Sequence, residues 1–124
     1  MKQLEPGAVI CENIFMAVIE LKNVGIRFDD FYLKNVSFSL EQGESLVVIG
    51  PSGQGKTVLL KLIAGLLEPH SGQVLIYGKD IHKLGQDERE QILFKMGMLF
   101  QKNALFDSLT CAENIAFPLR EVQK

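Results

Sequence analysis

The most constraining feature of the sequence is residues 50–57, Gly-Pro-Ser-Gly-Gln-Gly-Lys-Thr, which fit the pattern Gly, four residues, Gly-Lys-Ser/Thr. The apolar residues 46–49 before it predict a buried strand, and residues 58–64 after it predict a helix. Such a loop opens a helix N-terminus, where backbone N–H groups lack partners and the helix dipole favours an anion. We therefore expect an α/β fold with a phosphate-binding loop between a strand and a helix.

The residue types of the loop match the needs of a nucleoside triphosphate. Gly53 and Gly55 let successive backbone N–H groups curl around phosphate oxygens, where a Cβ would obstruct them. The amides of residues 55–58 should point at the β-phosphate, Lys56 should reach the β- and γ-phosphates, and the Thr57 hydroxyl should bind Mg²⁺. The predicted nucleotide-binding residues of the loop are Gly50, Ser52, Gly53, Gln54, Gly55, Lys56, Thr57 and Val58. The strand and helix on either side disfavour the alternative of a glycine-rich turn without a ligand.

Composition narrows the class of protein. The 124 residues are one domain's worth of chain, and 47% hydrophobic with 23% charged residues is typical of a globular core. The net charge of -2 and the absence of a basic run argue against a nucleic-acid partner. The two cysteines, Cys11 and Cys111, form no ligand pair or disulfide framework, which suits a reducing compartment.

The apolar stretch at residues 8–19 suggests a signal sequence, but its pattern argues against one. Glu12 and Asn13 interrupt it, Lys2 is the only basic residue before it, and it falls short of the ~20 apolar residues that span a bilayer. We expect a cytoplasmic chain whose domain covers residues 16–124 and starts at Met16. Residues 1–15 are then a false upstream start or a short N-terminal extension.

The remaining elements follow from periodicity and from turn residues. Residues 36–40 alternate apolar and polar side chains, as a half-buried antiparallel strand does. Thr110 and Glu113 have the spacing of a capping box, which predicts a helix that Pro118 ends. The other predicted strands are residues 18–21, 26–28, 74–77 and a buried 98–100, and residues 87–95 are predicted to be helical.

Five segments outside the loop carry a further signal, namely residues 19–24, 33–38, 71–74, 97–110 and 113–121. From about Ile19 to its last residue the chain resembles the N-terminal half of an ABC-transporter ATPase subunit. The last two segments resemble the Mla-type branch, which serves phospholipid transport across the Gram-negative envelope. The resemblance implies a phosphate-loop NTPase core with an N-terminal antiparallel β subdomain, truncated before the second half of the domain. It also implies that the nucleotide is ATP and that its hydrolysis drives transport, here of lipid.

The resemblance assigns roles to two residues outside the loop. Gln101 matches a glutamine that coordinates Mg²⁺ and the attacking water, a role that suits a neutral amide. Phe28 is the best match to an aromatic residue that stacks on adenine, although Phe31 and Tyr32 compete for that role and core packing is the alternative. Gln54 departs from the small residue frequent at its position, but its side chain can point to solvent while its N–H faces phosphate.

The resemblance also implies partners. Residues 102–120, from Lys102 to Arg120, are expected to receive a short helix of a membrane permease at the inner face of the inner membrane. Apolar residues on a surface loop and short helix support this partner: Leu105, Phe106, Leu109, Phe117 and Leu119. Equally open is that they pack on a part of the domain outside this chain. In the family, two ATPase domains form a homodimer around two ATP molecules.

Several elements that the family needs for catalysis do not occur in residues 1–124. No strand of four apolar residues followed by Asp-Glu, no Leu-Ser-Gly-Gly-Gln signature and no downstream switch histidine occurs. We expect the chain alone to bind ATP without hydrolysing it, and we expect flanking strands to come from outside it. A truncated, non-catalytic nucleotide-binding module is an alternative. A phosphate-loop kinase or GTPase would need a base-recognition motif or lid that the sequence lacks.

Overall fold

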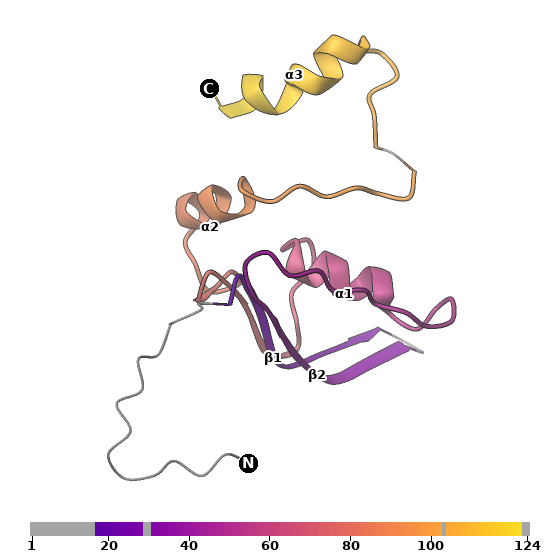
Figure 1. Ribbon diagram of the computed structural model, residues 1–124, viewed down its shortest axis with the longest axis vertical. Helices are drawn as coiled ribbons and strands as arrows, with labels where there is room; N and C mark the ends of the chain where they lie inside the picture. Colours follow the sequence, from indigo (N-terminus) through magenta and orange to yellow (C-terminus); the bar gives the residue numbers. More distant parts are fainter. Residues whose placement is uncertain (1–16, 29–30, 103, 123–124) are drawn as a thin grey trace.

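A twisted antiparallel sheet with a helix packed on one face forms the centre of the molecule (Figure 1). The computed structural model describes residues 17–28, 31–102 and 104–122, so the predictions for residues 1–15 and Met16 lie outside the described part. The strands are β1 (Ile19–Phe28), β2 (Phe31–Leu40), β3 (Ser71–Ile76) and β4 (Lys79–Asp80), in the spatial order β2-β1-β3-β4. The helices are α1 (Lys56–Ile63), α2 (Gln86–Leu93) and α3 (Cys111–Val122).

β1 is the central strand, and it joins two pieces that the sequence predicts separately. It pairs with β2 from Ile19↔Leu40 to Phe28↔Phe31, with register shifts between Leu21 and Ile26. Asn23 lies in this irregular part with φ 50, which interrupts the alternation of apolar and polar residues. The predicted antiparallel strand at residues 36–40 is confirmed as the second half of β2.

The core lies between this sheet and α1. Leu59 and Leu62 are the buried residues of α1, and Leu62 has no exposed surface. Burying a leucine side chain contributes about 1.5–3 kcal/mol, so these two contacts hold the helix on the sheet. The buried apolar residues that share this core are Leu21, Val24, Ile26, Leu59, Leu62, Val74, Ile76, Ile81 and Ile92.

The buried strands predicted at residues 46–49 and 98–100 are not formed. Neither segment pairs with a strand in the part of the chain that the structure describes, and Ile49 and Leu99 are 87% and 88% exposed. Leu46, Val48 and Met98 instead line one apolar groove beside α1. A strand needs a neighbour for its backbone N–H and C=O groups, and the apolar pattern alone does not supply one.

The capping box that predicts α3 is confirmed, whereas its predicted end is wrong. The Thr110 N–H donates to Glu113 Oε2 at 2.8 Å, and the Glu113 N–H donates to Thr110 Oγ1 at 3.3 Å. The helix continues through Pro118 to Val122. Pro118 is exposed, and its missing N–H removes the helical donor for one carbonyl, that of residue 114, without ending the helix.

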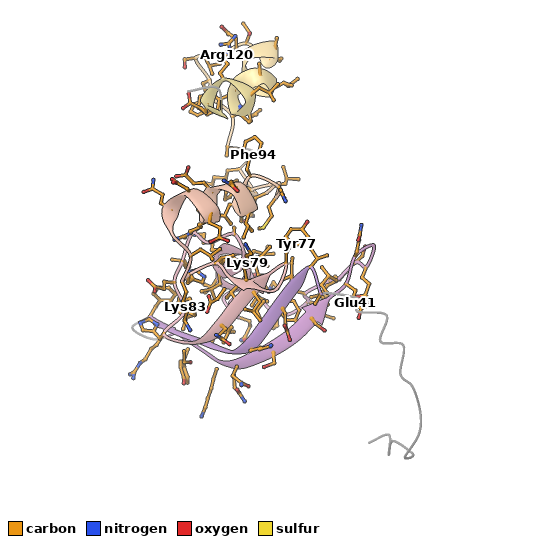
Figure 2. The ribbon with its side chains drawn as sticks, turned by 90° about the vertical axis from the view of Figure 1, so that its left-hand side faces the viewer. Glu41, Tyr77, Lys79, Lys83, Phe94 and Arg120 are labelled. Atoms are coloured by element: carbon orange, nitrogen blue, oxygen red, sulfur yellow. The ribbon has the colours of Figure 1, made fainter. Side chains whose placement is uncertain are left out.

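The C-terminal helix stands apart from the sheet. Figure 1 shows α3 at the end of a long connection from α2, and Figure 2 shows Phe94 between α2 and α3 with Arg120 out on α3. Phe94 is 56% exposed in this arrangement. The part of the chain after α2 therefore takes little part in the core described above.

Candidate functional site

The loop at residues 50–57 has the backbone form of an anion-binding nest. Gly53 has φ 79, and Gly55 has φ 86 and ψ 9, both in the left-handed region that glycine adopts without strain. Gly55 is the N-cap of α1, and among the described residues no side chain caps the helix. The first N–H groups of α1 are therefore without a side-chain acceptor in this part of the chain, as an anion-binding loop requires.

Lys56 holds its ammonium group over the same loop. Its Nζ donates to the carbonyl oxygens of Gly50 at 2.5 Å and Pro51 at 2.6 Å. These contacts join the first turn of α1 to the start of the loop and keep the positive charge close to the unpaired amides. The charge and the helix N-terminus both favour a bound anion at one place.

A hollow of about 540 Å³ opens beside the loop, and three separate segments of the chain line it. This volume is in the range of small-molecule sites. Its lining residues are Phe28 from β1, Ser52, Gly53, Gly55, Lys56, Thr57 and Val58 from the loop and α1, and Gln101. The structure thus brings together most of the residues that the sequence predicts for nucleotide binding. Gly50 and Gln54 do not line the hollow.

Phe28 reaches the hollow because of its position in β1. Side chains two residues apart lie on the same face of a strand, so Phe28 shares the face of the buried Ile26, which packs towards α1. Phe28 lies at the end of the strand, beyond the core, and is 40% exposed. Tyr32, its competitor, does not line the hollow and is 59% exposed. The side chain of Phe31 lies outside the described part.

Thr57 and Gln101 each bring a neutral side-chain oxygen to the hollow, as does Ser52. Thr57 and Gln101 are both exposed and line it from different segments, the first turn of α1 and the turn after residue 100. In residues 17–28, 31–102 and 104–122, no group of three or more His, Cys, Asp and Glu side chains could hold a metal ion. A hydroxyl and an amide fit a hard cation that takes most of its other ligands from phosphate and water.

Two side chains without a predicted role of their own, Asn114 and His70, form hydrogen bonds with backbone groups. The side chain of Asn114 donates to the carbonyl oxygens of Phe106, Leu109 and Thr110 at 3.0–3.2 Å and accepts the Phe106 N–H at 2.9 Å. It thereby folds the loop before α3 onto the helix. His70 Nδ1 accepts the N–H of Arg27, next to Phe28, at 3.3 Å. The His70 contact joins residues 43 positions apart and has no local sequence signal, whereas the Asn114 contacts join residues 4 to 8 positions apart.

The apolar residues of the segment 102–120 lie mostly on the surface. Leu105 is 67% exposed and Leu119 is 65% exposed. Phe106 and Phe117 contact one another with ring centroids 4.7 Å apart and planes tilted by 45°. An exposed apolar surface of this kind is typical of a site that another polypeptide covers. No helix of the described residues is long and apolar enough to cross a bilayer.

Comparison with known proteins gives one consistent result. The sequence profile of the family described as "ABC transporter" matches residues 33–124. The intermembrane phospholipid transport system ATP-binding protein MlaF of Haemophilus influenzae is 43% identical over 105 residues, or 84% of this chain and 40% of that protein. The spermidine/putrescine import ATP-binding protein PotA of Nitrosomonas eutropha is 46% identical over 106 residues, or 85% of this chain and 28% of that protein.

The solved structures agree with the sequence relatives. The dimeric structure of the bacterial ABC transporter cassette MJ0796 superposes with a TM-score of 0.72 at 36% identity, covering 83% of this chain and 47% of that one. The same cassette is also solved as a dimer bound to ADP and inorganic phosphate in a post-hydrolysis state. The chain thus spans less than half the length of these curated relatives and solved cassettes.

We predict that the Glu113 carboxylate half of the capping box of α3 weakens in acid. Hydrogen bonds from the backbone and hydroxyl of Thr110 lower the pKa of Glu113 below its ordinary value of 4.5. A lowered folded-state pKa means that the cap is fully present above pH 4.5 and is lost as pH falls through the lowered value. The helical content of α3, followed by NMR chemical shifts, should therefore fall in this window.

The Glu113→Gln variant is the control, because its side chain can still accept a hydrogen bond but does not titrate. Its α3 chemical shifts should be nearly constant between pH 6 and the acid limit of the titration. Equal acid sensitivity in both proteins would contradict the assignment of the cap to the Glu113 carboxylate.

Proposed function

This chain belongs to the ABC transporter family, as its ATP-binding part, and on that basis we propose that the hollow beside residues 50–57 binds ATP with Mg²⁺. The observation that carries the proposal is convergence: the loop, Phe28 and Gln101 are far apart in the sequence and line one hollow. Each of the three offers a different chemistry, namely phosphate binding, a flat apolar ring and a neutral amide.

The loop is proposed to bind the phosphate groups. The backbone N–H groups of residues 53–58 and the N-terminus of α1 supply donors, and Lys56 adds a full positive charge beside them. Ser52 and Val58 complete the wall of the hollow. Gly50 acts through its carbonyl oxygen, which accepts from Lys56, and Gln54 contributes its backbone N–H.

Phe28 is proposed to stack on the adenine ring. Its side chain lines the hollow from the end of β1, and the residue is 40% exposed. A base needs only a flat apolar face for stacking, which contributes about 1–3 kcal/mol where bases stack on aromatic side chains. Of the aromatic residues whose side chains are described, Phe28 is the one that lines the hollow.

Thr57 and Gln101 are the residues that would hold Mg²⁺. When bound, the ion would neutralise the charge of the β- and γ-phosphates. Gln101 is proposed to orient the attacking water as well, because its amide can both donate and accept a hydrogen bond. Lys56 remains in place to stabilise charge on the γ-phosphate.

Hydrolysis and transport are proposed as properties of a complete pair of cassettes. The chain spans about 40% of MlaF, and MJ0796 is solved as a dimer. We propose that elements outside residues 16–124 supply a catalytic carboxylate and the signature segment, and that this chain alone binds ATP without turnover. Residues 46–49 and 98–100 would then gain strand neighbours, which would cover the apolar groove beside α1.

The partner of the segment 102–120 is proposed to be a helix of a membrane permease. The exposed Leu105, Phe106 and Leu119 support this proposal, as does the Asn114 side chain that fixes the loop beneath them. The site would lie on the cytoplasmic face of the membrane. Phospholipid as the transported compound is supported by the match to MlaF, although PotA, named for spermidine and putrescine import, matches at a similar identity.

Lys56→Ala should weaken binding of Mg–ATP by about 10- to 100-fold. The reason is that the variant removes a charge-assisted contact to phosphate, which contributes about 1.5–3 kcal/mol. Binding is measured by titration with a fluorescent ATP analogue. Lys61→Ala is the matched control, because Lys61 is an exposed lysine at the other end of α1. Equal affinities for wild type and Lys56→Ala would overturn the proposed site.

Gln101→Ala should separate binding from turnover. Its affinity for Mg–ATP should change less than about threefold, because the phosphate loop is intact, while phosphate release by the assembled transporter ATPase should fall at least about tenfold. Gln42→Ala, in the exposed turn after β2, is the control and should retain full turnover. Full turnover in Gln101→Ala would remove Gln101 from the proposed reaction.

A further inference from the structure

The end of β1 that carries Phe28 is supported differently on its two edges. On one edge it pairs with β2 as far as Phe28↔Phe31. On the other edge the ladder with β3 stops at Gly25↔Ser71, two residues before Arg27. Strand pairing thus leaves the Arg27 N–H on this edge without a backbone acceptor.

His70 forms hydrogen bonds with the backbone of β1 at the point where the ladder with β3 stops. Its backbone N–H donates to the Gly25 carbonyl at 2.9 Å, and its Nδ1 accepts the Arg27 N–H at 3.3 Å. A single residue thereby bonds both exposed backbone groups of this edge, one with its main chain and one with its side chain. A histidine Nδ1 can accept such a hydrogen bond when the ring proton is on Nε2.

The backbone around His70 leaves it little freedom. Gly72 has φ 81, and a Cβ at this position would run into the carbonyl groups of Lys22 and Asn23. A Cβ on Gly25 would lie 2.6 Å from Ser71 Oγ. Two glycines therefore let the segment 70–72 approach β1 more closely than side chains would permit, which fixes the position from which the imidazole reaches Arg27.

Phe28 depends on this support because packing alone does not hold it. Its ring is 40% exposed, whereas Ile26 on the same face is 2% exposed. The direction of the Phe28 side chain is consequently set by the backbone of the last residues of β1. The hydrogen bond from Arg27 to His70 fixes that backbone on the edge that β2 does not cover.

We propose that His70 is a positioning residue for the nucleotide base: by accepting the Arg27 N–H it holds Phe28 at the angle needed to stack on the base. The inference rests on the proposed function of the hollow as an ATP site. In this proposal His70 affects binding of the base, and the loop binds the phosphates. His70 itself does not line the hollow.

The test compares two substitutions and two probes. His70→Leu introduces a side chain of similar size that has no hydrogen-bond acceptor. His70→Asn retains an acceptor oxygen near the position of Nδ1. Affinity is measured for Mg–ATP, which has a base, and for Mg–tripolyphosphate, which has none. His70→Leu should weaken ATP binding about three- to tenfold, the effect of one lost hydrogen bond, and leave tripolyphosphate binding unchanged. His70→Asn should bind both probes like wild type.

The Phe28→Ala variant tests whether Phe28 and His70 act together in ATP binding. It should show the same selective loss of ATP affinity, and adding His70→Leu to it should cause little further loss. Amide hydrogen exchange supplies a measurement independent of ligand binding: the Arg27 amide should exchange faster in His70→Leu than in wild type, with the Leu21 amide of the same strand as reference.

The outcomes distinguish failure of this inference from failure of the ATP site. Equal losses for ATP and tripolyphosphate in His70→Leu, or unchanged ATP affinity, would overturn the positioning role. An additive loss in the double variant would do the same. If the wild-type protein and Lys56→Ala bind tripolyphosphate equally, the proposed phosphate site itself is wrong. If His70→Leu does not fold, ATP binding by His70→Asn and hydrogen exchange of the Arg27 amide still test the proposal. Fast exchange of the Arg27 amide in the wild-type protein would contradict it.

Discussion

The packing of α1 on the antiparallel sheet determines where the loop at residues 52–58 and Phe28 lie. Leu59 and Leu62 fix the helix on a core built mainly from β1 and β3. The N-terminus of the helix and its loop are therefore held beside the end of β1. Phe28, which follows the core residue Ile26 on the same face, reaches the hollow for this reason. If α1 were displaced, the phosphate loop and the aromatic ring would no longer face one hollow.

Local patterns predicted the elements whose stability is local. The glycines of the loop, the helix that follows it and the Thr110–Glu113 capping box were all recognisable, because each depends on residues within a few positions of one another. Residues 46–49 and 98–100 were predicted as strands and are not, since pairing requires a neighbouring strand that the pattern does not reveal. Pro118 likewise lies inside α3 and does not mark its end.

The convergence of distant residues was only partly predictable. Phe28 and Gln101 were chosen through a resemblance to ABC-transporter ATPases, and the structure brings both to the phosphate loop. The resemblance favoured Phe28 over Tyr32, and the register of β1 with β2 adds a physical reason, because Tyr32 is paired with Arg27 and not with Phe28. His70 had no local sequence signal, and Asn114 lies in a segment that carries the resemblance but had no predicted role of its own. Their roles come from hydrogen bonds across 43 residues in one case and from a loop folded back on a helix in the other.

The account's central claim is that Phe28, the loop at residues 52–58 and Gln101 form one Mg–ATP site. The most direct measurement is a titration of the ¹⁵N-labelled protein with Mg–ATP, following all amide resonances by NMR. The account predicts that the amides of the loop, the end of β1 and Gln101 shift together with a single dissociation constant. Shifts confined to one of these segments, or different dissociation constants for the loop and for Phe28, would contradict it.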